Sequence, residues 1–144
     1  MSLKGNVLAT YQGSANPALK DYYPAWVDKL ADDATVEGSM LDGTIHGAEA
    51  VRNVVVTIRT LYGDTQEFHF AGPWSENGWV EDYIARVQGR PLGCVVLVTR
   101  NAAGQTQQIV ANYRPLSTVL HFSRLLGEQL ADTPYGKHFA TSAD

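Results

Sequence analysis

The first apolar pattern along the chain has the period of a helix. Asn16 and Pro17 stand before it and are typical of a helix N-cap and a first helical position. Pro24 lies on the opposite face of the pattern, where it would bend the helix around the core. The spacing predicts a helix over residues 17–30. Its apolar face comprises Leu19, Tyr22, Tyr23, Trp26, Val27 and Leu30.

A second helical pattern follows two short extended pieces. One piece is expected at residues 35–37 and the other ends at His46, with a loop between them. Gly47 begins the helical pattern, and Gly63 is a typical stop residue. The pattern therefore predicts a helix that ends near residue 62. Its apolar face comprises Val51, Val54, Val55, Ile58, Leu61 and Tyr62.

From Gln66 onward the apolar period changes to that of β-strands. Runs rich in Phe, Tyr, Val and Ile are separated by short turn sequences, which favours hairpins between antiparallel neighbours. The pattern predicts a four-stranded meander, followed by a helix over about 116–130 and a frayed end at residues 132–144. The expected strands are 66–72, 79–88, 92–100 and 105–114.

Closing each hairpin symmetrically about its turn predicts which side chains share a face of the sheet. One face is apolar and should pack under the helices. Its first two cross-strand rows are Phe68, Tyr83, Val96, Ile109 and Phe70, Glu81, Val98, Gln107. The opposite face has an apolar patch, formed by Ile84, Val95, Leu97 and Val110. Such a patch suits a partner subunit, so we expect a homodimer unless the C-terminal helix covers it.

Composition and charge narrow the classes of function. The 144 residues fit a single domain, and one cysteine, Cys94, excludes an internal disulfide. Eleven Lys and Arg against 15 Asp and Glu give a net charge of −4, which argues against nucleic acid and anionic membranes as partners. The apolar runs are far shorter than the about 20 residues of a membrane span, and residues 1–14 lack a signal-peptide core. We therefore expect a cytoplasmic protein.

The order of helix, short strands, helix and meander resembles the nuclear transport factor 2-like superfamily. This superfamily includes ketosteroid isomerase and the SnoaL-like polyketide cyclases. The sequence LADDATVE at residues 30–37 and GAEAVR at residues 47–52 carry the local resemblance. It covers residues 17–114 and leaves the C-terminal helix as an addition. The resemblance implies an α+β fold with a cone-shaped, curved antiparallel sheet packed against N-terminal helices, in proteins that often dimerise.

The resemblance does not extend to the catalytic residues of ketosteroid isomerase. The position that matches its general base, directly after the DDATVE run, is Gly38. The position that matches its protonated aspartic acid is Val96. Neither residue can accept a proton or donate a hydrogen bond from its side chain. We therefore expect this fold without steroid isomerisation, and the superfamily also contains binders and interaction modules.

Three residues are candidates for acid/base chemistry. Glu81 should point into the pocket, where desolvation would raise its pKa, although it lies near the Gly78 turn and a solvated strand end is the alternative. Asp42 and His46 flank the loop at the expected pocket mouth and form a common proton-transfer pair. The alternative for these two is an ordinary polar loop, with His46 helping to cap the following helix.

Aromatic side chains on the early helix and the inner sheet face are candidates for a pocket wall or for a plug that fills it. If there is chemistry, Tyr83 or Tyr23 would be a hydroxyl donor. We hypothesise a small, mainly apolar organic ligand that is isomerised or cyclised without a cofactor. No metal site is expected, because the histidine spacing matches none. The competing hypothesis is a non-catalytic dimeric binding module. The expected ligand contacts are Tyr22, Tyr23, Trp26, Phe68, Phe70, Tyr83, Val96 and Gln107.

Overall fold

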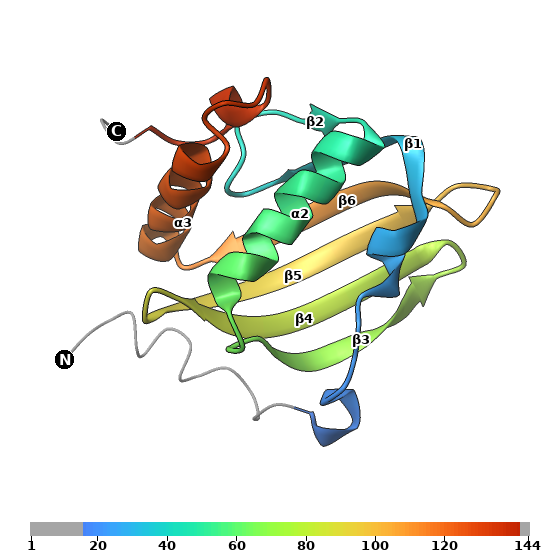
Figure 1. Ribbon diagram of the computed structural model, residues 1–144. Helices are drawn as coiled ribbons and strands as arrows, with labels where there is room; N and C mark the ends of the chain where they lie inside the picture. Colours follow the sequence, from blue (N-terminus) through green and yellow to red (C-terminus); the bar gives the residue numbers. More distant parts are fainter. Residues whose placement is uncertain (1–15, 142–144) are drawn as a thin grey trace.

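A computed structural model describes residues 16–141 of the chain and contains one curved, six-stranded sheet (Figure 1). The strand order is β2-β1-β6-β5-β4-β3. The predicted meander is confirmed. It consists of β3 (Glu67–Ser75), β4 (Gly78–Val87), β5 (Arg90–Arg100) and β6 (Thr106–Arg114).

The two short extended pieces add the remaining strands. β1 (Leu30–Gly38) is longer than expected, and β2 (Ile45–His46) pairs with it in antiparallel orientation. β1 lies beside β6 and runs parallel to it. The last strand of the meander, β6, thus lies next to β1 and runs in the same direction. The sheet is therefore mixed, whereas the sequence predicted an antiparallel sheet.

Two helices cover the inner face of the sheet. α2 (Ala48–Tyr62) and α3 (Leu116–Gln129) occupy the positions that the sequence predicted. The ring of Phe122 in α3 lies 5.7 Å from the ring of Tyr62 and 5.6 Å from that of Tyr113. α3 therefore packs on the same side as α2 (Figure 1), and within residues 16–141 no helix packs on the opposite face of the sheet.

The predicted helix over residues 17–30 is wrong. The segment forms two short 3-10 helices, η1 (Pro17–Leu19) and η2 (Ala25–Lys29), and β1 begins at once at Leu30. Asn16 does cap η1, since its Oδ1 accepts a hydrogen bond from the Ala18 N–H at 3.0 Å. Pro24 explains the break, because it lacks an N–H and its ring clashes with the carbonyl four residues earlier in a continuous helix.

Tyr83, Val96 and Ile109 lie on the inner face of the sheet as predicted, but the register of two hairpins differs from the prediction. Tyr83 lies opposite Cys94 rather than Val96, and Val96 lies opposite Ala111 rather than Ile109. At the β4–β5 connection only Gln88 and Gly89 form the turn, with φ of 51° and 78°. This tight turn shifts the pairing by two residues. Since side chains alternate with a period of two, each residue keeps its face.

A bulge in β3 changes the position of Phe70. The register shifts between Phe68 and Phe70, so that Phe70 lies opposite Asp82 instead of Glu81. Its side chain is 48% exposed. The expectation that Phe70 lines the pocket is therefore wrong, because the extra residue turns it away from the inner face.

The segment after α3 is packed, in contrast to the expected frayed end. η3 (Gly136–His138) follows α3, and the Phe139 side chain is only 5% exposed. The backbone N–H of Asp42 donates to the His138 carbonyl at 2.7 Å, which ties the β1–β2 loop to this segment. Residues 142–144 of the expected frayed end lie outside the described residues.

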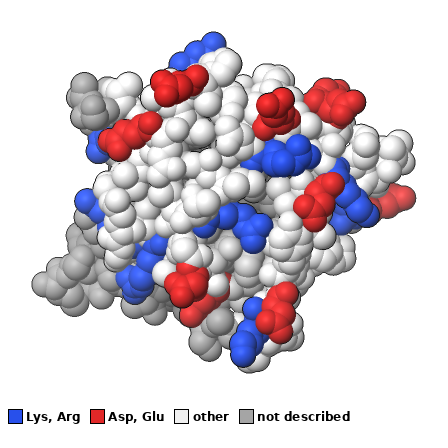
Figure 2. Space-filling model, viewed as in Figure 1, with Lys and Arg blue, Asp and Glu red and all other residues white. Residues whose placement is uncertain are grey.

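The face of the molecule shown in Figure 2 carries charges of both signs. Acidic and basic side chains are interspersed on the face shown in Figure 2, without a large basic patch. Within residues 16–141, the structure contains no helix with the length and apolar character that crossing a membrane requires.

Gly38 lies at the end of β1, where its backbone is close to Ala111 of β6. Its φ is +156°, and a Cβ atom at this position would lie 2.0 Å from the Ala111 carbonyl oxygen. Backbone atoms cannot move aside as a flexible side chain can. The position that matches the general base of ketosteroid isomerase therefore has no room for a carboxylate side chain.

We expect Gly38→Ala to lower the free energy of unfolding by about 2–4 kcal/mol, because the methyl group forces β1 away from β6. Gly89→Ala is the matched control, since Gly89 also has a positive φ but no atom within 4 Å of the place where a Cβ would lie. It should lose about 1 kcal/mol. Denaturant unfolding of both variants measures the difference, and equal losses would contradict the close approach.

Candidate functional site

Glu81 lies on the inner face of β4 and is 2% exposed. The Trp26 indole Nε1–H donates to its Oε2 at 2.8 Å, and the Tyr22 hydroxyl donates to the same oxygen. Among the described residues, both hydrogen bonds to the carboxylate end on Oε2. The solvated strand end considered for Glu81 is thus excluded, and the residue lies in the interior as its inner-face position indicated.

The broken early segment positions both donors. Trp26 belongs to η2, whereas Tyr22 lies just before the Pro24 break. The Tyr22 ring packs edge-on against Phe68, with 4.8 Å between ring centroids. Its hydroxyl accepts a hydrogen bond from Trp79 Nε1 at 2.9 Å while it donates to Glu81. Three aromatic side chains therefore hold the carboxylate in one place.

Burial raises the pKa of Glu81 above its ordinary value of 4.5. The hydrogen bonds from Tyr22 and Trp26, and the positive charge of Arg59, oppose this shift without cancelling it. The pKa of Tyr22 is raised as well, first by burial and then by the charge of Glu81. The phenol therefore stays protonated over the physiological range.

A cluster of three buried tyrosines lies deeper in the cone. The Tyr62 hydroxyl is 2.9 Å from that of Tyr83 and donates to that of Tyr113 at 3.0 Å. Burial raises the pKa of all three phenols well above the usual value. Burial also raises the pKa of the adjacent Cys94 thiol to about 12, which makes it unreactive at neutral pH.

Two cavities meet at Trp26. The mouth cavity has a volume of about 490 Å³ and is lined by Tyr22, Tyr23, Trp26, Trp79, Arg100 and their neighbours. The inner cavity has a volume of only about 40 Å³, and Glu81, Tyr83 and Val96 are among its lining residues. The cone is therefore almost filled around Glu81, and the larger space lies at its mouth.

The structure brings together most of the residues that the sequence nominated for a ligand site. Tyr22 and Trp26 contact Glu81 directly, and Tyr23 lines the mouth cavity. Tyr83 and Val96 line the inner cavity. Phe68 is buried against Tyr22 and Tyr83, with ring centroids at 4.8 and 5.2 Å, and it also borders a side cavity next to η1.

Gln107 does not lie at the site. Its side-chain Nε2 donates to Asp33 Oδ1 at 3.0 Å, and its Oε1 accepts from Asn101 Nδ2 at 3.3 Å. These bonds tie β6 to β1 and to the β5–β6 turn. The expectation of a ligand contact failed because the bulge in this hairpin changed the register near Arg100.

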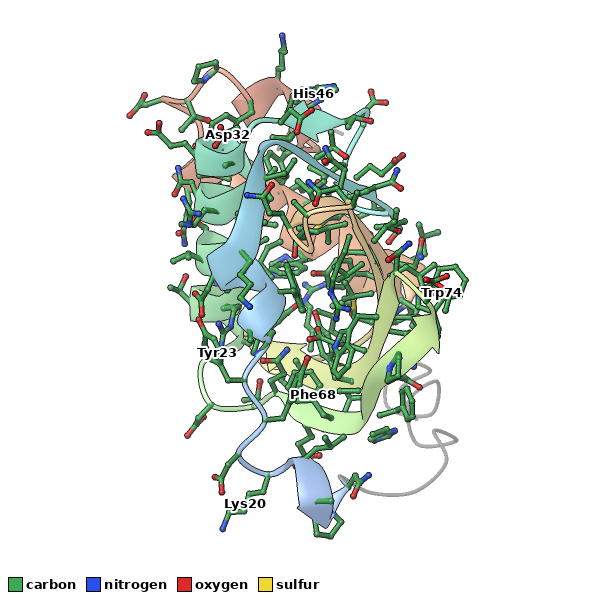
Figure 3. The ribbon with its side chains drawn as sticks, turned by 90° about the vertical axis from the view of Figure 1, so that its right-hand side faces the viewer. Lys20, Tyr23, Asp32, His46, Phe68 and Trp74 are labelled. Carbon is green, nitrogen blue, oxygen red and sulfur yellow. The ribbon has the colours of Figure 1, made fainter. Side chains whose placement is uncertain are left out.

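Asp42 and His46 are exposed and do not line either cavity around Glu81. The Asp42 carbonyl accepts a hydrogen bond from His138 Nδ1 at 2.7 Å, and Gly47 caps α2 without a side-chain bond. In Figure 3, His46 lies near one end of the molecule, and Tyr23 and Phe68 lie toward the other. The structure therefore does not join this pair to Glu81.

Three residues of the candidate site were not among those predicted from the sequence: Trp79, Tyr62 and Tyr113. Trp79 stands two residues before Glu81 in β4, so strand alternation places both on one face. The same alternation places Tyr113 on the inner face of β6, and Tyr62 ends the apolar face of α2. The periodicity therefore indicated that these residues face the interior. It did not distinguish residues of a filled core from residues that line a pocket.

Solved structures with similar folds were found, whereas no family model and no curated protein matches the sequence. An uncharacterised Silicibacter pomeroyi protein with a cystatin-like fold is 17% identical, with a TM-score of 0.70 over 80% of this chain and 83% of that one. A steroid delta-isomerase from Pseudomonas aeruginosa is 21% identical, with a TM-score of 0.67 over 89% of this chain and 91% of that one.

A third structure was solved with a small molecule bound. It is a Catenulispora acidiphila protein with a ketosteroid isomerase-like fold, in complex with trimethylamine. It is 13% identical and has a TM-score of 0.52 over 75% of this chain and 92% of that one. These likenesses show that the chain has the nuclear transport factor 2-like fold that its sequence resembles. At such low identity they do not show an activity.

We expect Glu81→Gln to change the pH dependence of stability. Because a raised folded-state pKa means that ionisation opposes folding, Glu81 stabilises the fold most below its ordinary pKa of 4.5 and loses that contribution as pH rises through the folded pKa. A glutamine side chain does not ionise, so the variant does not lose stability in this way as pH rises. The difference in unfolding free energy between Glu81→Gln and wild type should therefore grow in favour of the variant across this interval.

Denaturant unfolding between about pH 4 and 8 measures this difference. Glu76→Gln, in the exposed β3–β4 turn, is the control and should follow the wild-type profile. A Glu81→Gln profile parallel to that of wild type would place the Glu81 carboxyl in solvent and contradict its burial.

Proposed function

We propose that the protein binds a small, mainly apolar organic molecule at the mouth of the cone and isomerises or cyclises it by acid/base chemistry without a cofactor. The observation that carries this proposal is the buried carboxyl of Glu81, with its raised pKa, beside an aromatic cavity. A catalytic carboxyl works best when its pKa approaches the working pH, and burial moves Glu81 in that direction.

The volumes of the two cavities that meet at Trp26 support a ligand in the mouth cavity rather than in the inner cavity. The inner cavity of about 40 Å³ has room for water but is too small for a typical organic ligand, since ligand pockets measure about 300–1,000 Å³. The mouth cavity of about 490 Å³ accommodates a two-ring molecule, and the faces of Trp26 and Trp79 suit a flat one.

Tyr22 connects the mouth cavity with Glu81. In the proposed step, a proton leaves a carbon of the ligand for the Tyr22 oxygen while the Tyr22 hydroxyl proton passes to Oε2 of Glu81. This concerted transfer avoids a free phenolate, which the raised pKa of Tyr22 disfavours. Return of the proton to a different carbon of the ligand completes an isomerisation.

The second candidate is a binding module without chemistry. The observation in its favour is the nearly filled cone, because Tyr62, Tyr83 and Tyr113 occupy the space in which a substrate could meet Glu81 directly. In that case the mouth would hold a ligand and the carboxyl would serve only to fix Tyr22 and Trp26.

We expect the protein to exchange the acidic α-protons of 2-tetralone, a flat aromatic ketone, with deuterium from heavy water. Glu81→Gln and Tyr22→Phe should each lower this exchange at least about 100-fold, because each removes a member of the relay. Asp42→Asn should leave it unchanged. Proton NMR follows the loss of the α-proton signals.

Exchange that survives in Glu81→Gln would contradict the catalytic role of Glu81. Binding of 2-tetralone without exchange above the buffer rate would favour the binding module over the enzyme.

We also propose that the chain forms a homodimer through the outer face of the sheet. Ile84, Val95, Leu97 and Val110 lie half-buried on this face, and α3 packs on the other side. Among the described residues, no helix covers the patch, and a second copy of the chain would bring the same apolar residues against it.

We expect a dimer at micromolar concentration in sedimentation velocity and a monomer for Leu97→Glu, since a buried charge at the centre of the patch opposes association. Val56→Glu is the control, because Val56 is an apolar residue of α2 that is 50% exposed outside the patch. A wild-type monomer would contradict the proposed interface.

A further inference from the structure

We propose that the ligand of the mouth cavity carries a single acidic group, which Lys29 and Arg100 bind. This inference rests on the proposed function for the location of the ligand. It goes beyond it in specifying an organic anion, such as an aryl carboxylate, rather than a neutral apolar molecule.

The strand register brings the two cations to one end of the sheet. Leu30 of β1 and Arg100 of β5 both pair with Thr106 of β6. Two strand spacings place their Cα atoms about 10 Å apart, and Lys29 directly precedes Leu30. Two long side chains at this separation can reach the same carboxylate from opposite walls of the cavity.

The charge of the cavity is opposite to that of the chain. The whole chain carries a net charge of −4. Nevertheless, Lys29 and Arg100 line the mouth cavity, and none of the described residues that line it is acidic. Asp28, the nearest carboxylate in the sequence, accepts a hydrogen bond from the Tyr23 hydroxyl at 3.0 Å. The cavity therefore presents positive charge beside apolar rings.

Arg100 is held in place by an aromatic contact. Its guanidinium carbon lies 5.8 Å from the centroid of the Trp79 ring. Within residues 16–141, neither Arg100 nor Lys29 forms an ion pair, so both charges remain available to a ligand. A planar guanidinium with five N–H donors matches a carboxylate, and lysine adds a second positive charge.

The same contact connects the anion subsite to the acid/base group. Trp79 stacks under Arg100 and donates through Nε1 to the Tyr22 hydroxyl, which donates to Glu81. An acidic group on the Lys29 and Arg100 side would therefore orient the apolar body of the ligand across Trp79 and its reacting carbon toward Tyr22.

The test compares 2-naphthoate with 2-naphthamide, which has nearly the same shape and no charge. Tryptophan fluorescence or calorimetry measures the dissociation constants at neutral pH. We expect 2-naphthoate to bind about tenfold more tightly at low ionic strength, and this preference should fall as salt is added. Lys29→Gln and Arg100→Gln should each weaken 2-naphthoate binding about three- to tenfold and leave 2-naphthamide binding unchanged.

Matched controls exist on the same molecule. Arg90 stands at the opposite end of β5 from Arg100, and Lys137 is an exposed lysine of η3. Arg90→Gln and Lys137→Gln should keep the preference for 2-naphthoate. Equal affinity for the two probes, no binding of either probe, or a preference that Lys29→Gln and Arg100→Gln leave intact would overturn the proposal.

The outcome is separable from that of the proposed function. Glu81→Gln should retain the preference for 2-naphthoate, because the carboxyl acts on the reacting carbon and not on the acidic group. A preserved preference without any α-proton exchange of 2-tetralone would support the anion subsite and reject the catalytic role. Exchange that depends on Glu81, without a preference for 2-naphthoate, would support catalysis and reject the subsite.

Discussion

The hydrogen bonds from Tyr22 and Trp26 to the buried carboxyl of Glu81 are the interaction on which the arrangement of the site depends. Desolvation of a carboxyl is costly unless polar partners compensate it. Here the partners come from a segment about 55–59 residues away in the sequence. Pro24 interrupts the segment between the two donors, so that Tyr22 precedes the break and Trp26 lies in η2 after it, and β1 then begins at Leu30. The hydrogen bonds to Glu81 thus hold the segment that leads into β1 against β4. They also position Trp26, which lines both cavities.

A continuous series of contacts leads from the surface to the interior. Arg100 lies over Trp79, Trp79 donates to Tyr22, and Tyr22 donates to Glu81. The first member bears a permanent charge at the cavity mouth, and the last bears a carboxyl whose pKa burial has raised. We therefore assign anion binding to the Arg100 end of this aromatic wall and proton transfer to the Glu81 end. The deeper tyrosine cluster fills most of the cone, so that the mouth cavity is much larger than the inner cavity beside Glu81.

Periodicity was sufficient to predict the meander, α2, α3 and the inner position of Glu81, but not the exact cross-strand partners or the broken segment that holds Tyr22 and Trp26. The period of two in β4 places Glu81 and Tyr83 on the inner face, and this assignment survives a register shift of two residues. Gln107 and Phe70 were misplaced because bulges, which insert a single residue, leave little trace in the sequence. Asp42 could not be placed because its loop packs against His138, nearly a hundred residues later, and no local pattern reports such a contact.

The most direct measurement of the central claim is the pKa of Glu81 itself. Carbon-13 NMR of glutamate-labelled protein follows each side-chain carboxyl through a pH titration, and the spectrum of Glu81→Gln assigns the resonance of Glu81 by its disappearance. We expect a midpoint above the ordinary value of 4.5, since desolvation outweighs the two hydrogen bonds and the charge of Arg59. A midpoint at or below that value would show a solvated or ion-paired carboxylate and would contradict this account of the site.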